Sequence, residues 1–344
     1  MNKTALTKTY TKDIQNSCLN SKKIVLSLAA ISFSASCTHA TLTPEIETYE
    51  EATNRHAKAR SSFRSKSSNN GTINNSQTST KTVSNTGNTL VIESSGTITI
   101  SNGRQQAVNF TQDSSTSTFL NQGTLIGGNN TASVQLGASG NNGVTIENFN
   151  NQGIIGNGSS KFGVTVWGNS NNKSTINNFT NSGTIHSNAG ESIYFGNANI
   201  SSFANSGTIK SKQGAGVNIS QGTSIGNFNN TGTIEGKKDG IQINTNANVK
   251  TLTNKGTIKG DGISIRLNGT IETLTNEGIM DGKSTGIYMN KGFVKTLTNS
   301  GTINQNNSAT WAAGIKLQNN STIENIINTG SIHSNAFGIS VTGG

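Results

Sequence analysis

The sequence has little of what a conventional globular core needs. Hydrophobic residues make up 30% of its 344 residues, aromatic residues 5% and charged residues 12%, and this mixture makes a conventional core doubtful. Disordered chains are usually rich in charge and proline, whereas this chain has a single proline, Pro44. Its many Thr and Ile residues favour strands, and its many Asn and 40 Gly residues favour turns. The composition therefore favours β-structure over disorder.

Cysteine and concentrated charge are also scarce. Cys18 and Cys37 are the two cysteines, so the chain after residue 40 has no disulfide framework and no Cys-based metal site. The first 40 residues hold five lysines and one aspartate, which leaves +6 of the formal net charge of +10 for the rest. That charge is spread over some 300 residues without a basic cluster in the sequence. It predicts a solvated surface and no nucleic-acid partner.

Residues 1–40 have the layout of a secretory signal peptide. Lys22 and Lys23 precede IVLSLAAISFSASC, an apolar run of 14 residues, and Thr38, His39 and Ala40 follow. The run is too short to span a membrane as a helix, and the small residues suit cleavage after Ala40. A buried core helix is one alternative. A lipoprotein signal is another, in which Cys37 would be acylated, although Ser34 stands three residues before it where Leu is usual.

Residues 41–66 differ from everything that follows. Thr43 can cap a helix, Pro44 fits its first turn, and Glu51 lies four residues before Arg55. We expect a linker or a short N-terminal helix here.

A repeat begins at about residue 67 and runs to residue 344. Its marker is the glycine of the phrase N-x-G-[T/S/I]-I and its relatives, and successive glycines are 22 to 30 residues apart. The aligned glycines are Gly71, Gly96, Gly123, Gly153, Gly183, Gly207, Gly232, Gly256, Gly278, Gly301 and Gly330. Varying intervals on a constant phrase indicate loops of differing length on one framework.

Each repeat carries apolar residues in a strand-like pattern. In most units, apolar residues stand five and two positions before the Asn of the N-x-G phrase. Another apolar residue stands two positions after the Gly. A further strand has two apolar residues at period two, such as Ile241 and Ile243, or Ile263 and Ile265. Such strands lack a partner within the unit but can pair with the equivalent strand of the next. The pattern predicts an all-β fold, a right-handed, three-sided parallel β-helix of about 11 coils. A propeller or sandwich built from hairpins is the alternative, and it needs longer units.

In such a fold, equivalent residues of successive coils stack on one another. One polar residue per coil is therefore expected to form a ladder. These residues are Asn121, Asn151, Asn181, Asn205, Asn230, Asn254, Asn276, Asn299 and Asn328. Their amides can donate and accept along the stack. The glycine two positions later is expected to supply a positive φ at the corner.

Residues that could perform chemistry are few. His186 and His333 share one repeat position and are expected at the surface. Asp239 and Asp261 align before a glycine, but the grouped carboxylates of β-helix polysaccharide enzymes are missing, and so are calcium-binding nonapeptides. We expect no catalytic residue, cofactor or metal site. Outward Asn, Thr and Ser rows suit contact with carbohydrate or protein, or serve only solubility.

The leader KKIVLSLAAISFSAS and repeats such as NFTNSGTIHS and TLTNKGTIKG resemble the passenger domains of bacterial autotransporters (type V secretion). The adhesin-like epsilonproteobacterial members with N-x-G-T-I repeats are the most similar in kind, and the resemblance covers about residues 22–344. It implies export through the inner membrane, display at the outer membrane or release, and adhesion to a host-cell protein or glycan, or bacterial self-association.

The family's C-terminal translocator barrel is not present in residues 67–344, so the passenger is expected to be C-terminally incomplete. An open sheet end at Gly344 would favour end-to-end self-association. Two other functions stay open. One is a β-helix polysaccharide lyase or hydrolase, and the other is a haemagglutinin-like protein secreted by a two-partner system.

Overall fold

The computed structural model describes residues 71–84, 86–101, 103–156, 160–307 and 310–343. The predicted signal peptide, Cys37 and the predicted linker of residues 41–66 lie outside these ranges.

Three parallel sheets of 11 strands each make up the fold. The first sheet consists of β1 (Thr72–Ile73), β4 (Thr86–Ile92), β7 (Ser115–Asn121), β10 (Thr145–Asn151), β13 (Ser174–Asn181), β16 (Ala198–Asn205), β19 (Ser224–Asn230), β22 (Asn248–Asn254), β25 (Thr270–Asn276), β28 (Phe293–Asn299) and β31 (Thr322–Asn328). The second sheet consists of β2 (Ser76–Gln77), β5 (Thr97–Thr99), β8 (Thr124–Ile126), β11 (Ile154–Ile155), β14 (Thr184–Ser187), β17 (Thr208–Ser211), β20 (Thr233–Gly236), β23 (Thr257–Gly260), β26 (Ile279–Gly282), β29 (Thr302–Gln305) and β32 (Ser331–His333). The third sheet consists of β3 (Lys81–Val83), β6 (Val108–Phe110), β9 (Ala132–Leu136), β12 (Phe162–Trp167), β15 (Ile193–Gly196), β18 (Val217–Ile219), β21 (Asp239–Ile243), β24 (Ile263–Leu267), β27 (Thr285–Asn290), β30 (Ala313–Gln318) and β33 (Phe337–Thr342).

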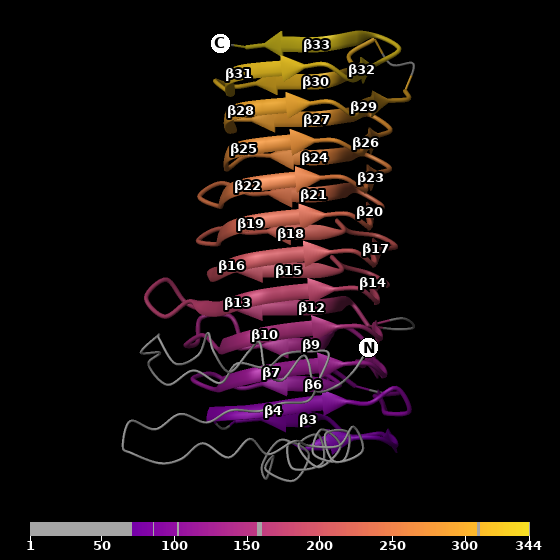
Figure 1. Ribbon diagram of the computed structural model, residues 1–344, viewed down its shortest axis with the longest axis vertical. Helices are drawn as coiled ribbons and strands as arrows, with labels where there is room; N and C mark the ends of the chain where they lie inside the picture. Colours follow the sequence, from indigo (N-terminus) through magenta and orange to yellow (C-terminus); the bar gives the residue numbers. More distant parts are fainter. Residues whose placement is uncertain (1–70, 85, 102, 157–159, 308–309, 344) are drawn as a thin grey trace, which may run out of the picture. The chain divides into compact units, whose positions relative to one another are not determined.

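Each strand pairs with the equivalent strand of the coils before and after it, as the stacked ribbons in Figure 1 show. One coil therefore contributes one strand to each sheet, and the chain passes through the three sheets in turn. This arrangement confirms the predicted three-sided parallel β-helix and excludes the hairpin-based alternative. Within the described ranges there is no helix that is long and apolar enough to cross a membrane.

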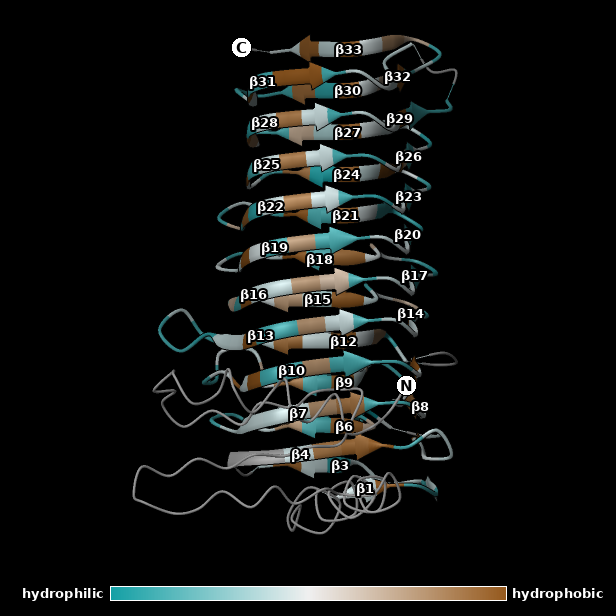
Figure 2. Cartoon of the chain, in the orientation of Figure 1, coloured by the Kyte–Doolittle hydropathy of each residue, from teal (hydrophilic) through white to brown (hydrophobic). Residues whose placement is uncertain are grey.

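The core is a continuous column of aliphatic and aromatic side chains between the three sheets. In β22, for example, Val249 and Leu252 are fully buried, whereas Lys250 is exposed. Figure 2 shows the resulting change between apolar and polar segments along the strands. A buried side chain of this size contributes ~1.5–3 kcal/mol, but only when coils lie on both sides of it.

The last coil shows what happens without a second neighbour. Ile326, Phe337 and Ile339 occupy positions that face the core in earlier coils, yet they are 41%, 51% and 46% exposed. No described coil follows them, so their apolar surface has no cover within residues 71–343.

The observed register corrects two of the predicted alignments. Gly71 does not align with Gly96, because Ile73 in the first sheet pairs with Ile92. In β24 the inward pair is Ile265 and Leu267 instead of Ile263 and Ile265, since Ile265 lies opposite Ile241. A slip of two residues keeps the same side chains inward, so the apolar pattern could not distinguish the two registers.

The glycine of the repeat phrase has a different role from the predicted one. Of the aligned glycines, Gly71 alone among the described residues has a positive φ, and it is the misaligned one. At Gly183 an added Cβ would lie 2.1 Å from the carbonyl oxygen of Gly153 in the coil before, and Gly207 has the same relation to Gly183. The predicted positive φ is therefore wrong. Glycine is needed because the backbones of successive coils approach too closely for a side chain.

Candidate functional site

The nine repeat asparagines form an unbroken hydrogen-bonded ladder along the inner edge of the first sheet. Each Nδ2 group donates to the Oδ1 atom of the next asparagine at 2.7 or 2.8 Å, from Asn121 through to Asn328. The same Nδ2 group also reaches backbone carbonyls, as Asn230 does with Gly232 at 3.2 Å and Thr257 at 3.3 Å. These amides are almost fully buried until the last coil. The ladder therefore joins coils, and from Asn121 to Asn299 it is not accessible to a ligand.

The ladder begins at Asn121. Ile92 lies opposite Asn121, so an apolar side chain takes the ladder position one coil earlier. The Oδ1 atom of Asn121 consequently has no hydrogen-bond donor among the described residues. The amide column begins where the sequence changes from Ile to Asn.

His186 lies on the outward-facing row of β14 and is half-buried, whereas His333 is exposed. Burial lowers the pKa of His186, and the charges of Lys212 and Lys210 lower it further. Its Nε2 atom has no hydrogen-bond partner among the described residues. The lowered pKa favours the neutral imidazole, and among the described residues no carboxylate orients it as a general base would require.

The two aspartates that align in the sequence are not opposite each other in the structure, although both line one pocket. Asp239 lies opposite Ile263, and its buried carboxylate accepts two hydrogen bonds from Arg266. Asp261 instead pairs with Lys237, whose hydrogen bond lowers the pKa of Asp261. Each carboxylate thus has its own cation, and they form no acid/base pair. The partnership of Asp239 with Arg266 has no sequence signal, because it spans 27 residues.

Metal ligands do not gather in the part of the chain that the structure describes. No group of three or more His, Cys, Asp or Glu side chains there could hold a metal ion.

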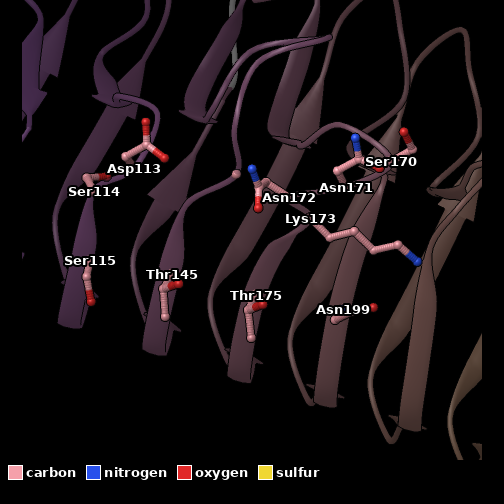
Figure 3. A pocket seen from close by; sticks show the side chains of 11 residues that line it. Asp113, Ser114, Ser115, Thr145, Ser170, Asn171, Asn172, Lys173, Thr175 and Asn199 are labelled. Carbon is pink, nitrogen blue, oxygen red and sulfur yellow. The ribbon is translucent and has the colours of Figure 1, made fainter.

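A polar groove crosses four coils at the start of the first-sheet strands β7, β10, β13 and β16 (Figure 3). Its floor is a row of hydroxyl and amide side chains on neighbouring strands: Ser115, Thr145, Thr175 and Asn199. Asp113 lies at one end, and Asn172 and Lys173 stand beside the row on a loop. Strand pairing brings these residues together although they are up to 86 positions apart.

The wall of the groove is formed by loops that are longer than those of later coils. Residues 137–144 connect β9 to β10, and residues 168–173 connect β12 to β13, whereas two residues connect β24 to β25. Sequence reasoning missed the groove, although the two 30-residue intervals between Gly123, Gly153 and Gly183 were its signal. Long loops on a regular solenoid are where irregular surface can form.

Asparagine side chains fix the shape of these loops. Oδ1 of Asn169 accepts hydrogen bonds from the backbone N–H groups of Asn171 and Asn172 at 2.9 and 2.7 Å, closing a local turn. Asn142 links the two loops, because its Oδ1 atom accepts from the Nδ2 groups of Asn169 and Asn172. The wall is therefore tied in place before any ligand arrives.

The groove is suited to binding and poorly suited to hydrolysis. Its lining consists of hydroxyl and amide groups with one carboxylate, Asp113, and one ammonium group, Lys173. Such groups can exchange hydrogen bonds with the hydroxyls of a sugar or with a peptide backbone. Glycoside hydrolysis ordinarily requires two carboxylates flanking the bond to be cleaved.

No family model, curated protein or solved structure matches the chain.

Proposed function

We propose that this chain is the passenger of a bacterial autotransporter, exported and displayed at the cell surface or released, where it binds a host-cell glycan or protein without catalysing a reaction. One observation carries the proposal. Eleven stacked coils bury the repeating apolar groups and the asparagine ladder in all but the last coil, and they turn hydroxyl and amide rows outward.

The physical properties of the fold suit this role. The described coils contain no cysteine, and each coil adds its strands to the one before. A chain of this kind can cross a membrane unfolded and then order coil by coil, because stability in solenoids is the sum of neighbour contacts. The leader and the N-x-G-T-I repeats favour the autotransporter route over two-partner secretion.

The groove is the proposed contact surface for adhesion. The Thr145 and Thr175 hydroxyls lie on its floor, next to the loop that carries Lys173. Lipidation of Cys37 and end-to-end self-association stay predictions.

The test measures binding of the purified, fluorescently labelled full chain to cultured epithelial cells by flow cytometry. The Thr145→Val/Thr175→Val variant removes two groove hydroxyls with little change in side-chain shape. We expect its binding to fall ~5-fold or more, since each lost hydrogen bond contributes about 1 kcal/mol.

The matched control is Thr253→Val/Thr275→Val, a paired change on the outer face of the same sheet in later coils. It should bind cells like the unmodified chain. Absence of cell binding by the unmodified chain, or turnover of a polysaccharide by it, would overturn the proposal.

A further inference from the structure

Four cationic side chains gather at the corner between the second and third sheets. Lys237, Lys238, Arg266 and Lys283 line one pocket, together with Asp239, Gln242 and Asp261. They come from three successive coils: the β20–β21 turn, β24 and the β26–β27 turn. The sequence shows no basic cluster because these residues are spread over 47 positions, and coil stacking brings them to one corner. Coil stacking therefore forms a local basic cluster that the sequence does not show.

Arg266 is fixed before any ligand binds. Its Nε and Nη2 groups donate to Oδ2 and Oδ1 of Asp239 at 2.8 and 3.1 Å. Its guanidinium carbon lies 5.2 Å from the ring centroid of Tyr288, and the Tyr288 hydroxyl donates to Gln318 at 2.7 Å. Asp239 is buried, whereas a third of the Arg266 side chain is exposed. The guanidinium therefore loses little rotamer freedom on binding, and its Nη1 group takes no part in these bonds.

The lysines supply charge that the pocket itself does not neutralise. Lys237 pairs with Asp261. Neither Lys238 nor Lys283 forms an ion pair with any carboxylate of the described residues, and both are exposed. Four cations thus face two carboxylates in this pocket, and each carboxylate already has its own partner. An anionic ligand group would meet two free ammonium groups and one preset guanidinium.

We propose that this corner binds an anionic substituent of a polysaccharide, a sulfate or a carboxylate group, through Lys238, Lys283 and Arg266. The surroundings favour a sugar chain over a nucleic acid. The cations form one local cluster at this corner, whereas a continuous phosphate backbone needs an unbroken basic stripe. Gln242, on the outer row of the third sheet, lines the same pocket. Its Nε2 group donates to Asn244, and its Oε1 atom can accept a hydrogen bond from a neutral hydroxyl between the charges of a glycan.

This inference names a class of ligand for the proposed function. It rests on that function only for the location at which the chain would encounter the ligand. The purified full chain is passed over immobilised heparin, a sulfated glycan, and over hyaluronate, whose charges are carboxylates, at ~0.15 M salt. The Lys238→Gln/Lys283→Gln variant removes the two free charges. The matched control is Lys250→Gln/Lys295→Gln, which removes two exposed lysines from the outer face of the first sheet.

We expect the unmodified chain to bind at least one glycan, and the corner variant to bind it about 10-fold more weakly, as expected for loss of charge-assisted contacts. The control should stay within ~2-fold, the change typical of distant surface charges. Circular dichroism checks that each variant keeps its sheet structure. Arg266→Lys, which keeps the charge but loses the bidentate geometry, should also weaken binding.

Comparing the two glycans identifies which anionic group binds at the corner. Preference for heparin identifies sulfate, and equal binding of hyaluronate identifies a carboxylate. Failure to bind both glycans, an equal loss in the control, or equally tight binding of duplex DNA would overturn the inference. Cell binding that persists while both glycans fail would leave the proposed function standing. Glycan binding without cell binding would overturn only the proposed function.

Discussion

The coils from β7 to β19 and the coils from β22 to β28 solve the same packing problem with different side chains. In the first group the core position two residues before the ladder asparagine holds phenylalanine, and in the second it holds leucine. The members are Phe119, Phe149, Phe179, Phe203 and Phe228, followed by Leu252, Leu274 and Leu297. Phe228 lies opposite Leu252, so the backbone register continues across the change. Neighbouring rings in the first group have centroids 4.3 to 5.1 Å apart.

The two groups also differ outside the core. The groove and the long loops belong to the earlier coils. The ion pairs among the described residues lie between Lys210 and Glu277, in the coils where the two groups meet. The asparagine and glycine ladders are common to both groups. The comparison indicates that the ladders set the coil geometry, while the core residues and the surface can vary independently.

The largest expected effect tests whether the glycine ladder serves both groups equally. An added Cβ at Gly183 would lie 2.1 Å from the Gly153 carbonyl oxygen, and one at Gly278 would lie 2.1 Å from that of Gly256. Gly183→Ala and Gly278→Ala should each lower the free energy of unfolding by ~3–4 kcal/mol, because backbone must move to relieve the overlap. Urea unfolding of each variant measures this change in the free energy of unfolding.

Gly338→Ala is the control for this change, since the nearest atom to its added Cβ is 4.0 Å away. It should change the free energy of unfolding by under ~1 kcal/mol. A large effect in one group of coils and none in the other would contradict the claim that the glycine ladder serves both groups equally.

The next effect concerns the asparagine ladder. Asn205→Ala in the earlier coils and Asn254→Ala in the later ones should each cost ~2–3 kcal/mol, because the neighbouring buried amides lose a donor and an acceptor. Asn328 is exposed in the last coil, so Asn328→Ala should cost under ~1 kcal/mol. Denaturant midpoints of the three variants compare them directly. Equal losses at all three positions would mean that burial does not set the strength of the ladder.

Exchanging phenylalanine and leucine between the two groups tests whether each core is packed for its own residue type. Phe179 stacks on Phe149 at 4.4 Å and on Phe203 at 5.1 Å. Phe179→Leu should cost ~1–2 kcal/mol through lost ring contacts and a small cavity. Leu274→Phe should cost ~1–3 kcal/mol through overpacking, because leucines lie on both sides of it. If either exchange were neutral in thermal unfolding, the two core types would be interchangeable.

The smallest effect is a pH dependence in the earlier coils. Burial and two lysines lower the pKa of His186 in the folded chain below the value of about 6.5 that an unfolded histidine has. The unfolded state therefore binds a proton that the folded state does not, and stability falls as the pH drops through ~6.5 until it reaches the folded pKa. His186→Gln should reduce the loss of stability between pH 7.5 and 5.5, and His333→Gln should leave it unchanged. Identical pH profiles for both variants would contradict this.

The sequence was sufficient for the fold because the repeat places one Asn, one Gly and several aliphatic residues at fixed offsets. Those offsets predict parallel stacking and the amide ladder. Register within single strands could not be predicted where three apolar residues alternate, as in Ile263, Ile265 and Leu267, because either pair can face inward. Ser264 decides it in the structure, since it takes the position of Gly240 in the coil before, and its hydroxyl donates to the Gly286 carbonyl.

The candidate sites were harder to predict than the fold. Both the groove and the basic corner depend on loop lengths and on which coils are neighbours, and a single repeat phrase contains neither. The Asp239–Arg266 pair and the unpaired Lys238 and Lys283 become visible only when residues about two dozen positions apart are stacked.

The most direct test of the whole account is a distance between two coils. Cys18 and Cys37 are replaced by serine, and spin labels are attached at Ser117→Cys and Glu272→Cys, which lie in the same outward row of the first sheet, six coil steps apart. Parallel stacking at about 4.8 Å per strand predicts a narrow distance distribution centred near ~29 Å in pulsed electron paramagnetic resonance. A broad distribution, or a main distance far from that value, would contradict the stacked-coil structure on which every proposed site depends.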